Sequence, residues 1–227
     1  MKYGQFCPVA KTAEILGEKW TILIIRELLM GATRFNQIQR GLNLISPTLL
    51  SSRLDKLEDL GLVIKKKSPA LKGHEYFSTK SCRDLLPIIK MMGEWGMLWT
   101  FSNVTNKDYD MELLMLYLER SVATDHLPDG ETTIKFKFVD LQQNANWWIV
   151  VQDGKKDLCI KDPGKEVDVY ITTDVKTMID VWMGEASYRA AEKNGEMKII
   201  GHKLLTQKIN SWLKDSVFKG LPTASNI

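Results

Sequence analysis

The segment from Ser46 to Gly61 constrains the fold more than any other part of this chain. Ser46 can accept a hydrogen bond from the free N–H groups at a helix start, and Pro47 fits the first helical position. Four leucines then recur at helical spacing before Gly61 ends the run: Leu50, Leu54, Leu57 and Leu60. The sequence therefore predicts a capped helix with one buried face. The opposite face carries small or polar groups and can approach another polymer closely: Thr48, Ser51, Ser52 and Lys56.

Short helices are predicted before this segment, and a two-stranded ribbon after it. Two apolar faces end at glycines, namely Val9, Ala13 and Leu16 before Gly17, and Trp20, Leu23, Ile24 and Leu28 before Gly31. A shorter helix at 34–39 turns Phe35 and Ile38 inward. Residues 62–67 and 75–78 read as strands around a loop with Pro69 and Gly73, and the first strand carries Lys65, Lys66 and Lys67.

Residues 81–101 are predicted to form one long helix with more apolar surface than a single domain can hide. Its apolar side chains cover over half of the circumference: Leu85, Leu86, Ile89, Met92, Trp95 and Leu98. Packing against a second copy of the same helix would cover that surface, so we expect a homodimer.

The second half of the chain follows a different pattern after a polar stretch near Asn103. A helix is predicted at 111–122, followed by strands at 133–139, 147–152, 158–160 and 167–172, with an Asp153-Gly154 turn inside a hairpin. Helical spacing returns at 175–182 and 204–213, with a strand at 197–200 between them. Strands gathered before helices favour an α+β layer over alternating βαβ units.

Length and charge agree with two domains, which we place at residues 1–103 and 104–227 of the 227. The first has 15 Lys and Arg against 9 Asp and Glu, and the second 16 against 19, so basic character is concentrated in the first half. No stretch reaches the ~18 apolar residues needed to span a bilayer, and the first residues lack a signal-peptide core. We expect a cytoplasmic protein that does not bind membranes.

A helix, a turn, a capped leucine helix and a lysine-bearing ribbon, in that order, are the parts of a winged helix-turn-helix. Such a fold places a helix in the major groove of double-stranded DNA and cations beside the phosphates. We expect the outer face of the 46–60 helix to read bases. The expected phosphate contacts are Arg34, Arg53, Lys56, Lys65, Lys66, Lys67 and Lys72. The alternative for the three consecutive lysines is that they only solvate a strand edge.

Several short motifs in this half resemble the HxlR family of bacterial winged-helix regulators. They are Cys7-Pro8-Val9-Ala10, Gly17-Glu18-Lys19-Trp20-Thr21, Arg26-Glu27-Leu28, Arg34-Phe35-Asn36, Ile45-Ser46-Pro47, Leu54-Asp55-Lys56-Leu57 and Gly61-Leu62-Val63. The resemblance covers 6–99. It implies a homodimeric transcription factor on an inverted-repeat operator, with the N-terminal segment and the last long helix at the dimer seam. It also implies DNA contacts at Arg34, after Ser46-Pro47 and in the wing.

Cys7 is a candidate redox sensor, because it precedes Pro8 at an expected helix start, where a thiolate is stabilised, and Lys11 lies one turn on. Some HxlR-like regulators are thought to sense oxidants through this cysteine. The alternative is a small apolar residue packed in the dimer seam. The other two cysteines, Cys82 and Cys159, have no disulfide or metal-ligand spacing with it.

The second half resembles the sterol-carrier-protein-like fold, from about Met111 to Lys214. The likeness rests on strand order and on two segments, Asp168-Val169-Tyr170-Ile171-Thr172-Thr173 and Met197-Lys198-Ile199-Ile200-Gly201. It implies an apolar or amphipathic small-molecule effector held between sheet and helices. The candidate pocket residues are Phe136, Phe138, Trp147, Met178, Trp182 and Trp212, and the alternative is that they simply form the core. The predicted fold class is thus α+β, a winged helix-turn-helix domain followed by a sterol-carrier-protein-like domain.

We do not expect an enzyme, a cofactor or a metal site. The three histidines are scattered, no glycine-rich phosphate loop follows a strand, and no serine lies in a nucleophile elbow. The sequence thus favours a dimeric regulator of transcription, acting as a repressor because occluding a promoter needs less machinery than recruiting polymerase. Two alternatives stay open: a carrier or protein-interaction module, and a methyltransferase-like protein that uses the winged helix only to dimerise.

Overall fold

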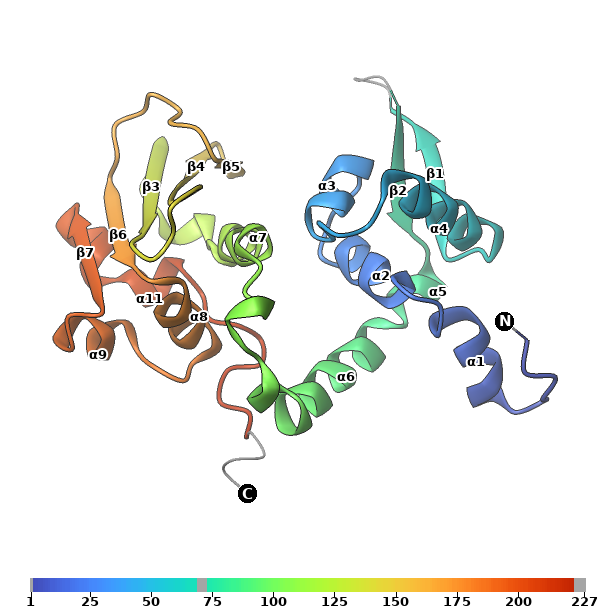
Figure 1. Ribbon diagram of the computed structural model, residues 1–227. Coiled ribbons are helices and arrows are strands. Elements are labelled where there is room, and N and C mark those ends of the chain that lie inside the picture. Colours follow the sequence, from blue (N-terminus) through green and yellow to red (C-terminus); the bar gives the residue numbers. More distant parts are fainter. Residues whose placement is uncertain (1, 69–72, 223–227) are drawn as a thin grey trace. The chain divides into compact units, whose positions relative to one another are not determined.

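The computed structural model describes residues 2–68 and 73–222, which form two compact units, Met1–Trp95 and Gly96–Ile227. The first unit contains helices, a two-stranded ribbon and then helices again (Figure 1). Its elements are α1 (Pro8–Leu16), α2 (Thr21–Leu29), α3 (Phe35–Arg40), α4 (Pro47–Asp59), β1 (Val63–Lys67), β2 (His74–Ser78), α5 (Lys80–Arg83) and α6 (Leu86–Trp99), which runs past the boundary. The predicted helix-turn-helix order and the antiparallel ribbon are confirmed.

The core of the first unit forms where α4 packs against the preceding helices. Leu50, Leu54 and Leu57 are fully or almost fully buried, as predicted, together with Ile24 and Ile38. Burying a leucine side chain contributes about 1.5–3 kcal/mol, so this stripe fixes how α4 lies on the domain.

Two predicted core positions of α2 and α4 are wrong, and in α1 Val9 of the predicted apolar face is exposed as well. Leu60 is exposed, because α4 ends at Asp59 and the chain turns at Gly61, whose φ is +69°, so that Leu62 enters the core instead. Leu23 is also exposed. The buried face of α2 is rotated by about one residue, so that Ile25 takes the place expected of Leu23.

The single helix predicted for 81–101 is wrong as well. The structure has two helices, α5 and α6, separated by Asp84 and Leu85. Pro87 explains the break, because its ring nitrogen cannot donate to the carbonyl of Arg83 and the ring would clash with that carbonyl in a continuous helix. A one-turn 3-10 helix (Phe101–Asn103) follows α6.

The second unit is a five-stranded mixed sheet with its helices (Figure 1). The strand order is β5-β4-β3-β6-β7, in which β3 and β6 are parallel and the other neighbours antiparallel. Its elements are α7 (Met111–Ser121), β3 (Glu131–Phe138), β4 (Asn146–Gln152), β5 (Lys155–Cys159), β6 (Val169–Thr173), α8 (Val175–Met183), α9 (Tyr188–Lys193), β7 (Met197–Gly201), α10 (Lys203–Gln207) and α11 (Ile209–Trp212), with 3-10 turns at Asn106–Asp108 and Thr124–His126.

The alternation predicted for the strand near 133–139 is confirmed, since Ile134, Phe136 and Phe138 all point into the core. The hairpin turn is also as predicted, with positive φ at Asp153 (51°) and Gly154 (71°). Two details differ from expectation. Helix α9 was not predicted, and the segment 204–213 forms two short helices, α10 and α11, rather than one.

Candidate nucleic-acid interface

Helix α4 starts as its sequence predicts. The Ser46 hydroxyl accepts a hydrogen bond from the Leu49 backbone N–H at 3.3 Å, and Pro47 occupies the first turn. The cap satisfies one of the free N–H groups at the helix start and contributes about 1 kcal/mol. With the leucine face buried, the cap and the core together fix which side chains point outward.

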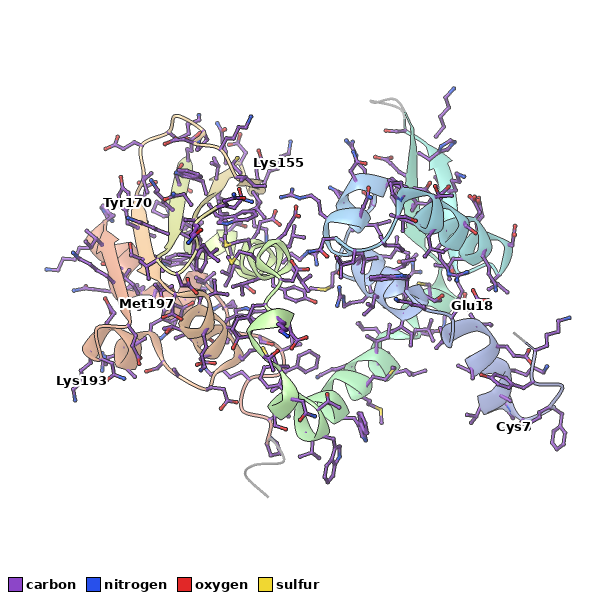
Figure 2. All side chains as sticks on the ribbon, in the orientation of Figure 1. Cys7, Glu18, Lys155, Tyr170, Lys193 and Met197 are labelled. Carbon is purple, nitrogen blue, oxygen red and sulfur yellow. The ribbon has the colours of Figure 1, made fainter. Side chains whose placement is uncertain are left out.

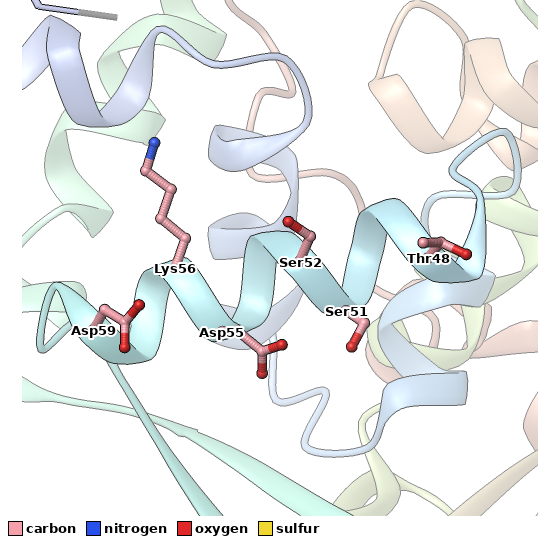
Figure 3. Close-up of a pocket in the computed structure, with 6 residues that line it drawn as sticks. All are labelled: Thr48, Ser51, Ser52, Asp55, Lys56 and Asp59. Carbon is pink, nitrogen blue, oxygen red and sulfur yellow. The ribbon is translucent and has the colours of Figure 1, made fainter.

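The outward face of α4 is open to solvent. Six side chains line a surface hollow of about 760 Å³: Thr48, Ser51, Ser52, Asp55, Lys56 and Asp59. In Figure 3, Lys56 and Ser52 extend to one side of the helix, while Ser51 and Asp55 extend to the other. All four side chains expected on this face are there. Asp55 and Asp59 were missed, although they follow Ser51 at four-residue steps and therefore share its face.

Arg34 lies at the start of α3, beside the wing. The Gln37 side chain accepts hydrogen bonds from the backbone N–H groups of Thr33 and Arg34 at 3.0 and 3.1 Å, which fixes the helix start. The Arg34 side chain is 41% exposed and forms an ion pair with Glu75 at 3.7 Å. A contact this long at the surface restrains the guanidinium weakly.

The wing is the β1–β2 ribbon, in which Lys67 pairs with His74 near the tip. Lys66 and Lys67 are exposed. Lys65 instead donates to Asp55 of α4 at 2.9 Å, and this hydrogen bond raises the pKa of Lys65. Lys72 lies outside the described residues. The structure thus separates two exposed wing lysines from one that is held against α4.

Arg53 and Lys56 are held in a similar way, by a residue that the sequence did not single out. Arg53 Nη1 lies 2.6 Å from Glu18 Oε2, and the Lys56 ammonium donates to Glu18 Oε1. The Lys56 hydrogen bond lowers the pKa of Glu18. Glu18 lies in the turn between α1 and α2, more than thirty positions before its partners, so no local spacing could have identified it.

Cys7 precedes the first residue of α1 and is half-buried. Figure 2 labels it near the N-terminal end of this helix. The Lys11 ammonium, expected to help a thiolate, hydrogen-bonds to Glu14 at 3.1 Å. Cys82 is buried in the core, and burial raises the pKa of its thiol, as suits an unreactive cysteine.

Five of the six candidate pocket residues are almost fully buried in the core of the second unit: Phe136, Phe138, Trp147, Met178 and Trp212. Trp182 is partly buried, stacks on Tyr117 at 5.1 Å and donates its indole N–H to the Ser121 hydroxyl. The structure therefore brings all six candidate pocket residues together in one hydrophobic core. Such close burial is also expected if these residues form only the core and line no ligand pocket.

The apolar surface of α6 is exposed in the single chain. Six large side chains contribute to it: Leu86, Ile88, Met91, Met92, Trp95 and Trp99. Scattered exposed apolar residues are normal, but a run of this kind on one helix indicates an interaction surface.

Comparisons with known proteins agree with the two units. The model of the HxlR-like helix-turn-helix family matches residues 15–103, and that of the SCP-2 sterol transfer family matches residues 117–214. An uncharacterized HTH-type transcriptional regulator of Mycobacterium tuberculosis, MT3179, is 43% identical over 89 residues, which are 39% of this chain and 56% of that protein. This chain thus spans little more than half the length of the first of these relatives.

Two relatives from Bacillus subtilis are matched over nearly their whole length. The uncharacterized HTH-type transcriptional regulator YvaP is 34% identical over 101 residues, covering 44% of this chain and 94% of YvaP. The reduced form of the transcriptional regulator YodB superposes with a TM-score of 0.36 and 30% identity, covering 40% of this chain and 92% of YodB. Among the described residues, no helix has the length and apolar character needed to cross a membrane.

Proposed function

We propose that this chain, which belongs to the HxlR-like helix-turn-helix family of DNA-binding transcriptional regulators, works as a homodimeric repressor of transcription. The observation that carries the proposal is the outward face of α4, which is capped at Ser46, fixed by buried leucines and open to solvent. A rigid helix with small side chains on its free face fits the major groove.

In this proposal Thr48, Ser51 and Ser52 contact base edges, because their hydroxyls can donate to or accept from bases. Ser46 lies at the helix start beside them. Arg34, Lys66 and Lys67 contact phosphates. The Lys66 and Lys67 side chains are exposed, and Lys66 lies over the uncharged Phe77 ring at 5.6 Å, which does not neutralise its charge. Arg34 is partly exposed and its ion pair with Glu75 is long, at 3.7 Å. Lys72 belongs to the same group by its position in the sequence. Arg53, Lys56 and Lys65 reach phosphate only if they leave Glu18 or Asp55.

Dimerisation through α6 would give the protein the two-fold symmetry of an inverted-repeat operator. The exposed apolar side chains of α6 support this step, since water contact with them is unfavourable and a second α6 has the same apolar surface. Cys7, just before α1, is also proposed as a redox sensor. If it is, oxidation should release the wild type from DNA but should not release a Cys7→Ser variant. A repressor role follows if the bound dimer occludes a promoter.

The second unit, matched by the sterol transfer family, would bind an apolar or amphipathic effector. The aromatic side chains around Trp182 and Trp212 would line or close its site. An effector that binds one dimer geometry better than another shifts operator affinity by that difference in binding free energy. We place the boundary between the DNA-binding and effector domains at Asn103, where the family match for the first domain also ends.

The test is binding of the full chain to its own upstream DNA at several salt concentrations. With contacts to several phosphates, log affinity should fall linearly with log salt, by about 0.9 per phosphate contact. Arg34→Ala should weaken binding to all sequences, whereas Ser52→Ala should change the preference among sequences at one base pair by about 0.5–1.5 kcal/mol, the net value of one hydrogen bond.

Salt-independent or absent DNA binding would contradict the proposal and favour a carrier or protein-interaction module. If both variants bound like the wild type, the contacts assigned to α4 and α3 would be wrong. Co-purified apolar molecules, sought by native mass spectrometry, test the effector step separately, because an empty second unit would leave DNA binding intact.

A further inference from the structure

Glu18 links the turn between α1 and α2 to the cationic side chains of α4. Figure 2 labels Glu18 at this turn. Its two carboxylate oxygens take different partners, Arg53 Nη1 at 2.6 Å and the Lys56 ammonium. Arg53 Nε also donates to the Lys19 carbonyl at 3.3 Å, which holds the guanidinium at this turn. One carboxylate therefore engages both cations that the DNA-facing helix carries in its central part.

The three side chains lie at the edge of the α4 face. Lys56 lines the same surface hollow as Thr48 and Ser52. The side-chain exposures are 19% for Glu18, 22% for Arg53 and 42% for Lys56, so the cluster is partly desolvated yet open on the Lys56 side. A phosphate approaching Lys56 would therefore also approach the Glu18 carboxylate.

The charges of this cluster decide its effect on a polyanion. Two cations and one carboxylate leave a single net positive charge where the sequence suggests two. The Lys56 hydrogen bond holds the pKa of Glu18 below its ordinary value, so the carboxylate stays ionised near neutral pH. A phosphate must either share Lys56 with a negative group or replace that group.

We infer that Glu18 competes with DNA phosphates for Lys56 and Arg53 and so lowers the affinity of the protein for duplex DNA of any sequence. This inference rests on the proposed DNA-binding function and identifies Glu18 as a residue that weakens DNA binding. The competition acts on the phosphate contacts, which carry no sequence information, so it weakens non-specific binding. Base contacts by Ser51 and Thr48 do not involve Glu18.

The test compares Glu18→Gln with the wild type on a mixed-sequence DNA duplex, by fluorescence anisotropy from about 50 to 200 mM salt. Glutamine keeps the shape and an oxygen acceptor but removes the charge. We expect about fivefold tighter binding at the lowest salt, the factor for one unit charge about 4 Å away in water. The slope of log affinity against log salt should steepen by about 0.9, because one more phosphate can be neutralised.

Glu14→Gln is the matched control. Glu14 is similarly covered, at 15% side-chain exposure, and it contacts Lys11 and the Tyr3 backbone rather than α4. The control removes the same charge from the same domain. We expect Glu14→Gln to leave the salt slope unchanged and to change the affinity for DNA by less than about twofold, because salt screens charges that lie far from the DNA.

A second pair of variants tests the inference without changing Glu18, in case Glu18→Gln does not fold. Lys56→Gln alone should lower the salt slope by about 0.9, and the double variant Arg53→Gln/Lys56→Gln should lower it by no more than that, because Glu18 already neutralises one of the two cations.

An unchanged or weaker affinity of folded Glu18→Gln with an unaltered slope would overturn the inference and leave Glu18 a purely structural link. So would a double variant Arg53→Gln/Lys56→Gln that lowered the salt slope by twice as much as Lys56→Gln alone. If the wild type itself shows no salt-dependent DNA binding, the proposed function fails first, and that result is distinct from wild-type binding that the Glu18 variant does not strengthen.

Discussion

Replacing Trp95 with alanine should weaken the proposed dimer strongly while leaving the single chain folded. Trp95 lies on α6 with 62% of its surface exposed. A tryptophan has about 250 Å² to bury, so about 150 Å² is open to a partner. At about 25 cal/mol per Å², its full burial is worth about 4 kcal/mol per copy.

A symmetric dimer buries two copies of this ring, so truncation removes at most about 8 kcal/mol. If a partner covers only half of each ring, the loss is about 4 kcal/mol, which raises the dissociation constant about a thousandfold. The entropy cost of association is the same in both proteins and cancels in the comparison.

Sedimentation equilibrium over a wide range of protein concentrations measures this effect. Val139→Ala is the control, because Val139 is also 62% exposed but lies in the second unit, after β3. We expect the control to dimerise like the wild type. A Trp95→Ala protein that dimerised within threefold of the wild type, or a wild type that stayed monomeric at high concentration, would refute the assignment of α6 to the dimer seam.

Two further predictions concern stability. Gly41→Ala should destabilise the first unit by about 1–3 kcal/mol, because its new Cβ would lie 2.1 Å from Oε2 of the buried Glu27 side chain, and urea unfolding checks this. Gly96→Ala, whose Cβ has its nearest neighbour at 3.6 Å, should not destabilise the protein. The lowered pKa of Glu18 means that its contribution to stability is present above the unfolded pKa and is lost as pH falls through the folded one. Glu18→Gln should therefore cost the most stability near neutral pH and progressively less as the pH falls below the ordinary glutamate range, and thermal melts that show the same loss at every pH would contradict this.

Local patterns predicted the parts of the fold that depend on near neighbours along the chain. The Ser46 cap, the alternation around Phe136 and the Asp153-Gly154 turn each depend on interactions within a few residues, and all three were confirmed. The break at Pro87 had a local cause too, but the apolar spacing around it outweighed that signal in the prediction.

The order of residues along the chain was enough to predict which face of α4 is buried and which residue types lie on its free face, because hydrophobic spacing and capping are local properties of the chain. Among the described residues, which cations near that face lack a carboxylate partner became clear only from the packing of the folded domain. Glu18 meets Arg53 and Lys56, and Asp55 meets Lys65, because α1, α2, α4 and the wing pack in one particular way. Ion pairs form through space between groups far apart in sequence, so charge counts along the chain overestimate the cations that face a DNA phosphate.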